Sequence, residues 1–507
     1  MSEVDHLSID PPPAGHRWNL LVFSSCVALQ YLAAPVIYVG ITQAALLKQL
    51  GANATIANLP AASFFVMATL VALIAWYKPR VADLKPVLIW CYSLAAVASA
   101  LVGVALISPV SSDFKIYAVI AQSAITGATI PTAIAFIWEV LGRGTLKSER
   151  GLALGLAYGV GPVLAALGSM GSQLILAGEF KFFAVTLETL TYQFPGNFAL
   201  LFFLEAPVMA LAAFLSSRFD IEAPRLEEPD RKPFAEVRDL FLGVICSVAA
   251  MICMLLAGAN ASVQLQGREW LFPLAYLLMG ASVVLFAYHF RDLLSVRLIR
   301  LATIVTMIVY IGNMIPSNMA LYSEEVMGLD PQQTAGYQNA MRFGFKAIAG
   351  LMLGWILTRS NARWGILVTS GLYVMSLLWA MCASSGMYLF AFGIFGAGEL
   401  IGVYAPNYIL SASRKTQMRR SMVMMTVLMA PVGQLGPVFG QIADRIHEYK
   451  ITAFGQTSRA LGFQVSFAVC AAVILVGILV AVIWLPGNPS PVKDGERGTD
   501  QVTPPGS

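Results

Sequence analysis

The sequence predicts an all-α integral membrane protein with two six-helix bundles and two inserted helices, fourteen transmembrane helices in all. Three observations lead to this fold class. The 507 residues are 58% hydrophobic and only 12% charged, whereas a soluble domain carries about 25% charged residues. Apolar windows of about 20 residues recur along the chain. Two short motifs recur at a fixed shift of 275 residues inside these windows, and we expect a pseudo-twofold parallel repeat to relate the bundles.

Each apolar window is long enough to cross a bilayer as a helix. The windows are too long for barrel strands, which take about 10 residues, and their residues do not alternate between polar and apolar. The fourteen predicted spans are roughly 18–45, 55–76, 86–107, 114–141, 151–176, 198–216, 240–263, 270–290, 300–322, 336–358, 364–385, 387–412, 420–443 and 463–485.

The basic residues predict the orientation. If the N-terminus is cytoplasmic, the inner segments hold twenty-three of the 32 Lys and Arg residues and the outer segments hold seven. By the positive-inside rule, both termini then face the cytoplasm. Residues 1–17 lack the basic start and short apolar core of a cleavable signal. We therefore predict a multi-pass protein of a bacterial inner (plasma) membrane.

The internal repeat indicates a duplicated bundle. Residues 127–131 (Gly-Ala-Thr-Ile-Pro) recur as 402–406 (Gly-Val-Tyr-Ala-Pro), and 161–163 (Gly-Pro-Val) recur as 436–438. Eight spans separate equivalent points, and this even number lets both halves enter the membrane from the same side. Duplicated bundles are typical of secondary transporters, which hold the substrate between the halves.

The repeat and the composition divide the chain into five parts. A polar stretch separates the two halves, and the C-terminal residues are rich in Pro, Gly, Ser and charge, as in disordered tails. The predicted parts are a cytoplasmic N-terminal segment (1–17), an N-terminal six-helix bundle (18–216), a cytoplasmic linker with two inserted helices (217–299), a C-terminal six-helix bundle (300–485) and a disordered cytoplasmic tail (486–507).

Over residues 18–485 this pattern resembles the major facilitator superfamily in its fourteen-helix form. The most specific local match is Gly-Val-Gly-Pro at 159–162, similar to the Gly-Pro signature of proton-driven antiporters. The loop motif of the family lacks its acidic residue near Arg359 and keeps only its charge near Arg80. The first span contains no acid or base, unlike that of proton-coupled peptide transporters. The resemblance implies a secondary active transporter that works by alternating access.

Two basic residues inside a predicted span need a reason, since an uncompensated charge at mid-membrane costs about 3 kcal/mol. Arg342 and Lys346 lie one turn apart, and Asn339 lies on the same helix face. Two cations on one face could bind an anionic substrate. They could equally form a structural ion pair with a carboxylate of a neighbouring helix.

Two carboxylates are candidates for proton coupling. Glu399 lies three residues before Gly402, in the helix that by the family resemblance borders the central cavity. A carboxylate in an apolar setting can take up and release a proton, and a nearby cation competes with that proton. Glu399 could instead pair with Arg342 or Lys346 without transport chemistry. Glu205, the second candidate, could instead make a polar contact between helices.

Polar side chains on the helix faces extend the candidate site. Each of them could instead make hydrogen bonds between helices, as is common in membrane bundles. The further candidates for substrate binding are Tyr31, Tyr38, Gln122, Asn313 and Asn407. Glycine and proline allow close packing and bending in the fifth helix of each half. The predicted gating and packing residues are Gly161, Pro162, Gly436, Pro437, Arg80 and Arg359.

The sequence thus predicts a secondary active transporter of a small solute, with a preference for organic anions and for proton coupling. The alternative is a transport-inactive relative that acts as a membrane assembly or partner-binding protein. The chain carries no Walker motif and no catalytic set of an intramembrane enzyme, so we predict no enzymatic activity. We also expect no cofactor, no metal site and no nucleic-acid partner. The expected partners are a small-molecule substrate, protons and the lipid bilayer.

Overall fold

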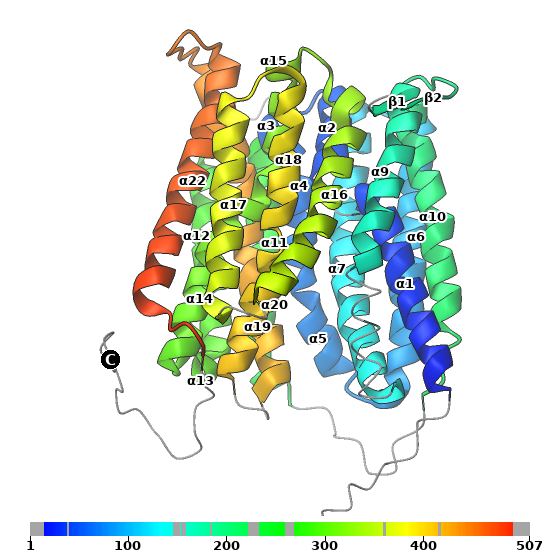
Figure 1. The fold of residues 1–507 in the computed structure, drawn as a ribbon, viewed down its shortest axis with the longest axis vertical. Coiled ribbons are helices and arrows are strands. Elements are labelled where there is room, and N and C mark those ends of the chain that lie inside the picture. The colour runs from blue at the N-terminus through cyan, green and yellow to red at the C-terminus, as the bar shows by residue number, and fades with distance from the viewer. Residues whose placement is uncertain are drawn as a thin grey trace, which may run out of the picture.

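The computed structural model describes residues 15–37, 40–145, 153, 159–182, 185–221, 233–258, 268–357, 361–413 and 417–489. Long helices run side by side along one axis (Figure 1). Among the described residues, twelve helices are long and apolar enough to cross a membrane. The protein is therefore an all-α, multi-pass membrane protein. Helix α9 (Gly161–Ala177) is apolar but shorter, and α16 (Pro331–Leu357) is not among the twelve, so the count of fourteen spans stays a prediction.

The predicted division groups the elements into a first half, an inserted part and a second half. The first half contains α1 (His16–Ile37), α2 (Ile41–Gln49), α3 (Ala54–Ala57), α4 (Leu59–Ala68), α5 (Leu70–Tyr77), η1 (Val81–Asp83), α6 (Leu84–Ile107), α7 (Ser112–Gly144), α9, β1 (Glu179–Phe182), β2 (Val185–Glu188) and α10 (Gly196–Ser216). The inserted part contains η3 (Phe234–Glu236), α11 (Arg238–Gly258), η4 (Arg268–Trp270), α12 (Leu271–His289) and α13 (Arg291–Leu294).

The second half follows the inserted part. It contains α14 (Arg297–Tyr310), η5 (Ile311–Met314), α15 (Pro316–Met327), α16, α17 (Ala362–Cys382), η6 (Ser385–Tyr388), α18 (Leu389–Gly398), α19 (Ile401–Ala412), α20 (Met418–Gly433), α21 (Leu435–Glu448) and α22 (Ser458–Trp484).

A short antiparallel hairpin was not predicted. Strands β1 and β2 pair with Glu179 opposite Glu188, and the hairpin lies at one end of the bundle beyond α9 (Figure 1). It does not span the membrane. The Phe180 ring stacks on Tyr337 of α16 with centroids 5.0 Å apart, so the hairpin joins the first half to the second.

Several predicted spans are broken helices. The first is interrupted before α2, where Gly40 adopts φ 123°. The first span of the second half passes from α14 through the 3₁₀ turn η5 into α15, which starts at Pro316. Proline lacks the backbone donor that would continue the helix and fits its first turn. Another break at Glu399 and Leu400 separates α18 from α19. These breaks lie where the helices border the interior.

The same helix pairs pack in both halves. Helix α6 packs on α10 and α7, as α17 packs on α22 and α18, and α4 packs on α7 as α16 packs on α18. This recurrence is what a duplicated bundle predicts, although the exact domain boundaries stay a prediction. The inserted helices α11 and α12 pack on each other, α11 also contacts α4, and α12 contacts α20. The inserted pair therefore touches both halves.

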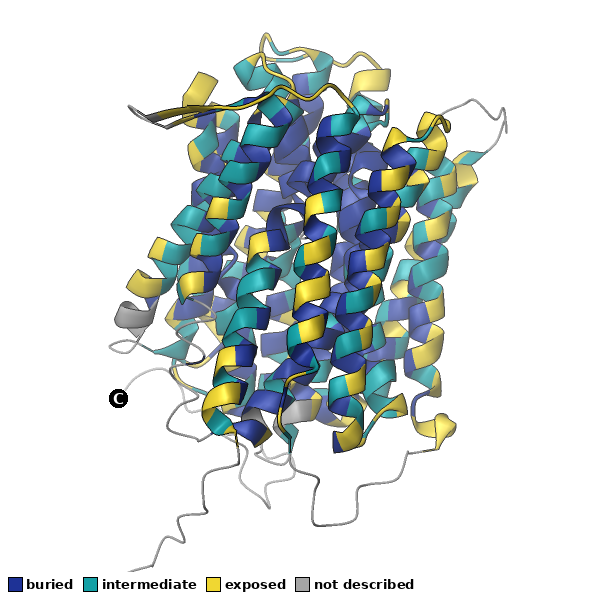
Figure 2. Cartoon of the chain, turned by 90° about the vertical axis from the view of Figure 1, so that its right-hand side faces the viewer, coloured by how far each residue is buried: buried dark blue, intermediate teal, exposed yellow. Residues whose placement is uncertain are grey.

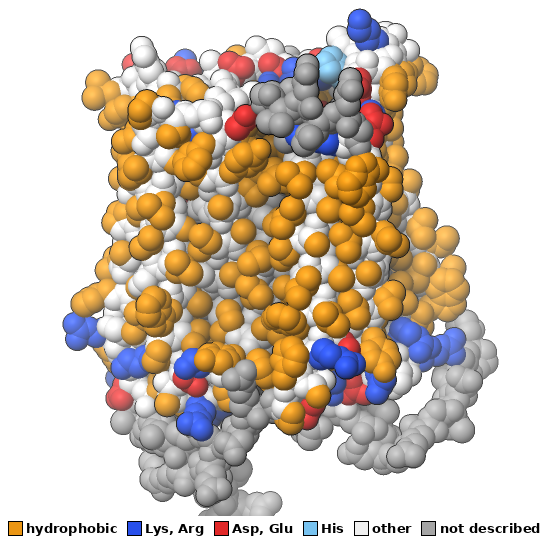
Figure 3. Space-filling view, turned by 180° about the vertical axis from the view of Figure 1, so that it is seen from behind, with side chains coloured by type: hydrophobic (Ala, Val, Ile, Leu, Met, Phe, Trp, Pro, Cys, Tyr) orange, Lys and Arg blue, Asp and Glu red, His pale blue; other side chains and the backbone are white. Residues whose placement is uncertain are grey.

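The surface has the pattern of a protein surrounded by lipid. Buried residues fill the interior, and exposed ones follow the outward faces of the helices (Figure 2). Hydrophobic side chains cover the middle of the visible face, while Lys and Arg gather at its lower end (Figure 3). Helix α22 ends at the same end (Figure 1). We refer to this end as the inner end and to the opposite one as the outer end, following the positive-inside rule.

Candidate functional site

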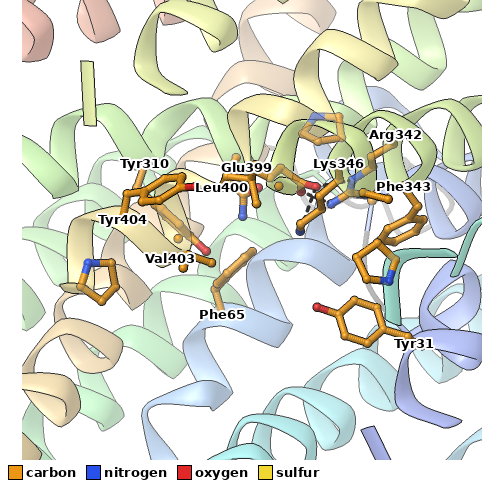
Figure 4. Close-up of a pocket in the computed structure, with 18 of the residues that line it drawn as sticks. Tyr31, Phe65, Tyr310, Arg342, Phe343, Lys346, Glu399, Leu400, Val403 and Tyr404 are labelled. Carbon is orange, nitrogen blue, oxygen red and sulfur yellow. Dashed lines mark hydrogen bonds and ion pairs between the residues drawn. The ribbon is translucent and has the colours of Figure 1, made fainter. Parts of the chain in front are cut away.

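A cavity of about 880 Å³ lies between the two halves. Its lining combines aromatic walls with a charged cluster that the second half supplies (Figure 4). The first half contributes residues including Tyr31, Gly40, Phe64, Phe65, Trp138 and Pro162. The second half contributes residues including Tyr310, Asn313, Ser317, Arg342, Phe343, Lys346, Glu399, Tyr404 and Asn407.

The charged cluster consists of two cations around one carboxylate. The Nε of Arg342 donates to Oε2 of Glu399 at 3.0 Å, and its Nη2 donates to Oε1. The Nζ of Lys346 lies 3.4 Å from the same Oε2. Arg342 and Glu399 are 7% and 8% exposed. The sequence left two roles open for these residues, and the structure shows that the ion pair forms inside the cavity.

Glycine lets helices α16 and α18 approach closely enough for the ion pair between Arg342 and Glu399. A Cβ at position 396 of α18 would lie 1.9 Å from the backbone carbonyl oxygen of Arg342, so only glycine fits there. Helix α18 ends at Gly398, and the backbone N–H of the next residue, Glu399, still donates to the Phe395 carbonyl at 3.0 Å. Close packing and a local break thus aim the Glu399 carboxylate at α16.

The cluster carries a surplus positive charge and an unused donor. Arg342, Lys346 and Glu399 are the charged side chains in the described lining, and together they leave a net charge of +1. The Nη1 of Arg342 is buried without a hydrogen-bond partner. A buried donor without a partner costs about 1–3 kcal/mol. An anion beside Nη1 would satisfy the donor and neutralise the surplus charge.

Aromatic rings complete the walls. The Arg342 guanidinium lies 5.5 Å from the Phe343 ring centroid and 5.6 Å from that of Phe395. Phe65 of the first half meets Tyr310 of the second edge to face, with centroids 6.1 Å apart. Flat apolar walls around a cationic group suit an organic anion with an apolar body.

Contacts between the halves close the cavity at its outer end. The Nδ2 of Asn339 donates to Oγ1 of Thr42 at 3.1 Å. The backbone N–H of Gly336 donates to Oε1 of Gln173 at 3.0 Å, and Lys48 pairs with Glu324.

Asp444 makes a further contact of this kind. Its carboxylate accepts from the backbone N–H groups of Ala54 and Thr55 at 3.0 and 2.8 Å, and from the Thr55 hydroxyl at 2.6 Å. At the other end, the cavity lining reaches Trp138 and Met422. The described contacts between the halves thus lie at the outer end, while the cavity lining extends towards the inner end.

The structure brings together most of the predicted binding residues. The lining includes the predicted residues Arg342, Lys346, Glu399, Tyr31, Asn313, Asn407 and Pro162. Gly161 supports this wall, because a Cβ there would lie 2.3 Å from the Tyr31 ring. Gly161 is also the first residue of α9, so the Gly-Pro pair begins a described helix.

Other predicted residues lie away from the cavity lining. Glu205 is buried in α10 and accepts from the Ser99 hydroxyl of α6 at 2.9 Å, which is the contact between helices weighed as its alternative role. Gln122 is buried in α7, and Asn339 joins α16 to α2.

The predicted gating residues lie at several depths. Gly436 and Pro437 are buried at the start of α21. Arg80 lies exposed in the loop before η1. Tyr38 and Arg359 lie outside the described residues.

Sequence reasoning missed several residues that the structure places at the site. Phe65, Phe343 and Trp138 line the cavity, but aromatic residues in an apolar span look the same whether they face lipid or a cavity. Asp444 meets Thr55 across 389 residues of sequence, and no local pattern connects them. Among the described residues, no group of His, Cys, Asp and Glu could hold a metal ion.

Comparisons of sequence give no assignment: no protein-family model and no curated protein matches the chain. Solved structures do match over almost the whole chain. The POT family transporter PepTSo matches with a TM-score of 0.62 at 13% identity, over 93% of this chain and 98% of that one. A POT family transporter in complex with 5-aminolevulinic acid matches with a TM-score of 0.61 at 14% identity, over 93% and 96%.

The nucleoside transporter NupG matches with a TM-score of 0.55 at 10% identity, over 91% of this chain and 98% of that one. The chain therefore has the fold of these transporters. At these identities the likeness concerns the fold alone. The first helix carries no acidic or basic residue between Trp18 and Ile37, and the charged side chains of the cavity lining belong to the second half.

Proposed function

We propose that this protein is a secondary active transporter of small organic anions that couples transport to protons by alternating access. The observation that carries the proposal is the buried Arg342 with its unpartnered Nη1, in the central cavity of a transporter fold. Binding sites of such folds lie near the membrane midplane between the halves. A buried cation with a free donor is suited to bind a carboxylate or a phosphate.

Proton coupling follows from competition for the two cations. Ionised Glu399 occupies Nε and Nη2 of Arg342 and attracts Lys346. When Glu399 takes up a proton, it loses its charge and holds both cations less strongly. The anion of the substrate can then replace Glu399 beside Arg342 and Lys346. When the proton leaves, Glu399 reclaims the cations and the substrate is released.

Transport would also require the two halves to move relative to each other. A six-helix bundle over residues 18–216 and a second over residues 300–485 would rock about the cavity, with the two inserted helices completing fourteen spans and both termini in the cytoplasm. The outer contacts around Asp444 and Lys48 would open as the inner side closes. A POT family transporter with the same fold has been crystallised with 5-aminolevulinic acid, a small solute with a carboxylate, which is the kind of group that Arg342 could bind.

The test is a comparison of driven transport with exchange in proteoliposomes. We expect an inward proton gradient to drive uptake of an organic anion by the wild-type protein. Glu399→Gln should abolish this driven uptake but keep anion exchange, since a permanent neutral side chain leaves the two cations available. Glu448→Gln serves as the control, because Glu448 bonds to Arg445 within the same helix at 3.1 Å. Driven uptake that survives in Glu399→Gln would refute the coupling role.

A further inference from the structure

The first spans of the two halves break at equivalent places. Helix α2 begins at Ile41 and α15 begins at Pro316, and these positions are 275 residues apart, the shift that relates the two motifs of the repeat. The two half-helices contact each other. The broken ends also border the cavity, because Gly40 and Pro316 belong to its lining. Paired breaks of this kind mark binding sites in duplicated transporters.

Both half-helices present their N-terminal ends without a cap. No side chain makes a capping hydrogen bond at Gly40 or at Ile315. The first backbone N–H groups of a helix have no partner within it, and the aligned peptide dipoles place about half a positive charge there. Two such ends side by side at one cavity wall favour negative charge.

An independent observation supports a ligand at this place. Ser317, in the first turn of α15, is 1% exposed and belongs to the cavity lining, and its Oγ has no hydrogen-bond partner. The free hydroxyl can donate to an anion. Gly40 keeps the space beside it open, since a Cβ there would lie 3.4 Å from this Oγ. The φ of 123° at Gly40 also favours glycine.

The free groups favour an anion over a cation. Carbonyl oxygens of the preceding segments already have donors: the Gln43 amide donates to the Val36 carbonyl, and the Ile315 N–H donates to the Gly312 carbonyl at 3.3 Å. The N–H groups that start α2 and α15 have no such side-chain partners. A cation would need free carbonyl oxygens or carboxylates.

We infer that the N-terminal ends of α2 and α15, together with Ser317, form a second anion subsite, so that the transported solute carries two acidic groups. This inference rests on the proposed function and names its substrate class as small dicarboxylates and similar dianions. One acidic group binds Arg342 and Lys346, and the other binds the paired helix ends. With a proton on Glu399, the two cations and the dianion leave the cavity neutral, which favours passage through the membrane interior.

Binding by the purified full-length protein tests the inference. The probes are straight-chain α,ω-dicarboxylates of about four to eight carbons and monocarboxylates of equal length, measured by calorimetry. We expect the best dicarboxylate to bind at least about tenfold more tightly than its monocarboxylate, which corresponds to about 1.4 kcal/mol. Ser317→Asp should remove this preference, because its own carboxylate occupies the helix ends, while an acidic residue in the first turn suits the helix. Ser317→Ala should reduce the preference by less.

The control places the same charge elsewhere. Ser112→Asp adds a carboxylate at the exposed start of α7 and should leave the preference for dicarboxylates unchanged. Equal binding of both series by the wild type overturns the second subsite. The proposed function still stands in that case if Arg342→Ala abolishes monocarboxylate binding. Sodium-dependent binding that Ser317→Asp strengthens also overturns the inference. If neither series binds to the wild type, both proposals fail.

Discussion

Replacing Asp444 by Asn should weaken the contact between the halves at the outer end and favour a state in which this end is open. The carboxylate of Asp444 accepts three hydrogen bonds from Ala54 and Thr55, across the interface between the two halves at the outer end. A hydrogen bond to a charged group contributes about 1.5–3 kcal/mol. Asparagine keeps one acceptor oxygen but loses the charge, so we expect a loss of roughly one such bond. That loss moves the equilibrium by about 10- to 150-fold.

The distance between the outer ends of the halves reports this shift. Spin labels on Ser112→Cys, at the start of α7, and on the native Cys382, at the end of α17, both occupy exposed positions, with the other five cysteines replaced by alanine. Double electron–electron resonance spectroscopy should show a larger fraction of long distances between the two labels in Asp444→Asn than in the parent protein. Glu448→Gln, on the same helix, should not change the distances. Identical distributions in Asp444→Asn and the parent would refute the role assigned to this contact.

Three further predictions concern Glu205, Gly396 and Arg342. Glu205→Gln should leave proton-driven uptake unchanged in proteoliposomes, because Glu205 bonds to Ser99 outside the cavity lining; loss of driven uptake would give it a coupling role. Gly396→Ala should lower the free energy of unfolding by about 1–3 kcal/mol through overpacking, which a lower melting temperature would report. The Cβ of the alanine would lie 1.9 Å from the Arg342 carbonyl oxygen. Gly371→Ala, where nothing lies within 4 Å, should not lower the melting temperature. Arg342→Lys should weaken anion binding in calorimetry, because an ammonium cannot replace the guanidinium fork; wild-type affinity would contradict this.

The helical bundle could be predicted because each helix is determined by its own short stretch of sequence. Each long apolar window must form a helix in lipid, since its backbone groups have no water to bond to. The charged cluster was accessible for the same reason, as ionisable residues inside a span are rare and need partners. Arg342, Lys346 and Glu399 therefore stood out in the sequence, and the structure brings them together.

Features that depend on tertiary contacts could not be predicted. The break before Ile41 lies in a continuous apolar window, and hydropathy does not report the φ of Gly40. Aromatic residues such as Phe65 can face either lipid or a cavity. The helical period of the sequence therefore does not show which of the two surroundings such a residue has. Glu205 shows the reverse case: it stood out as an intramembrane charge, yet Ser99 provides a structural partner.

Charge-displacement recording on proteoliposomes distinguishes a transporter of organic anions from the alternatives. The panel contains organic anions, peptides, sugars and cationic drugs, applied with and without a proton gradient. We expect currents for organic dianions, whose two negative charges exceed the one proton on Glu399; the gradient should enhance these currents, and Arg342→Ala should abolish them. Currents confined to sugars or cations, or undiminished anion currents in Arg342→Ala, would contradict this expectation. A complete lack of transport, together with a stable co-purifying partner, would favour a membrane assembly protein instead.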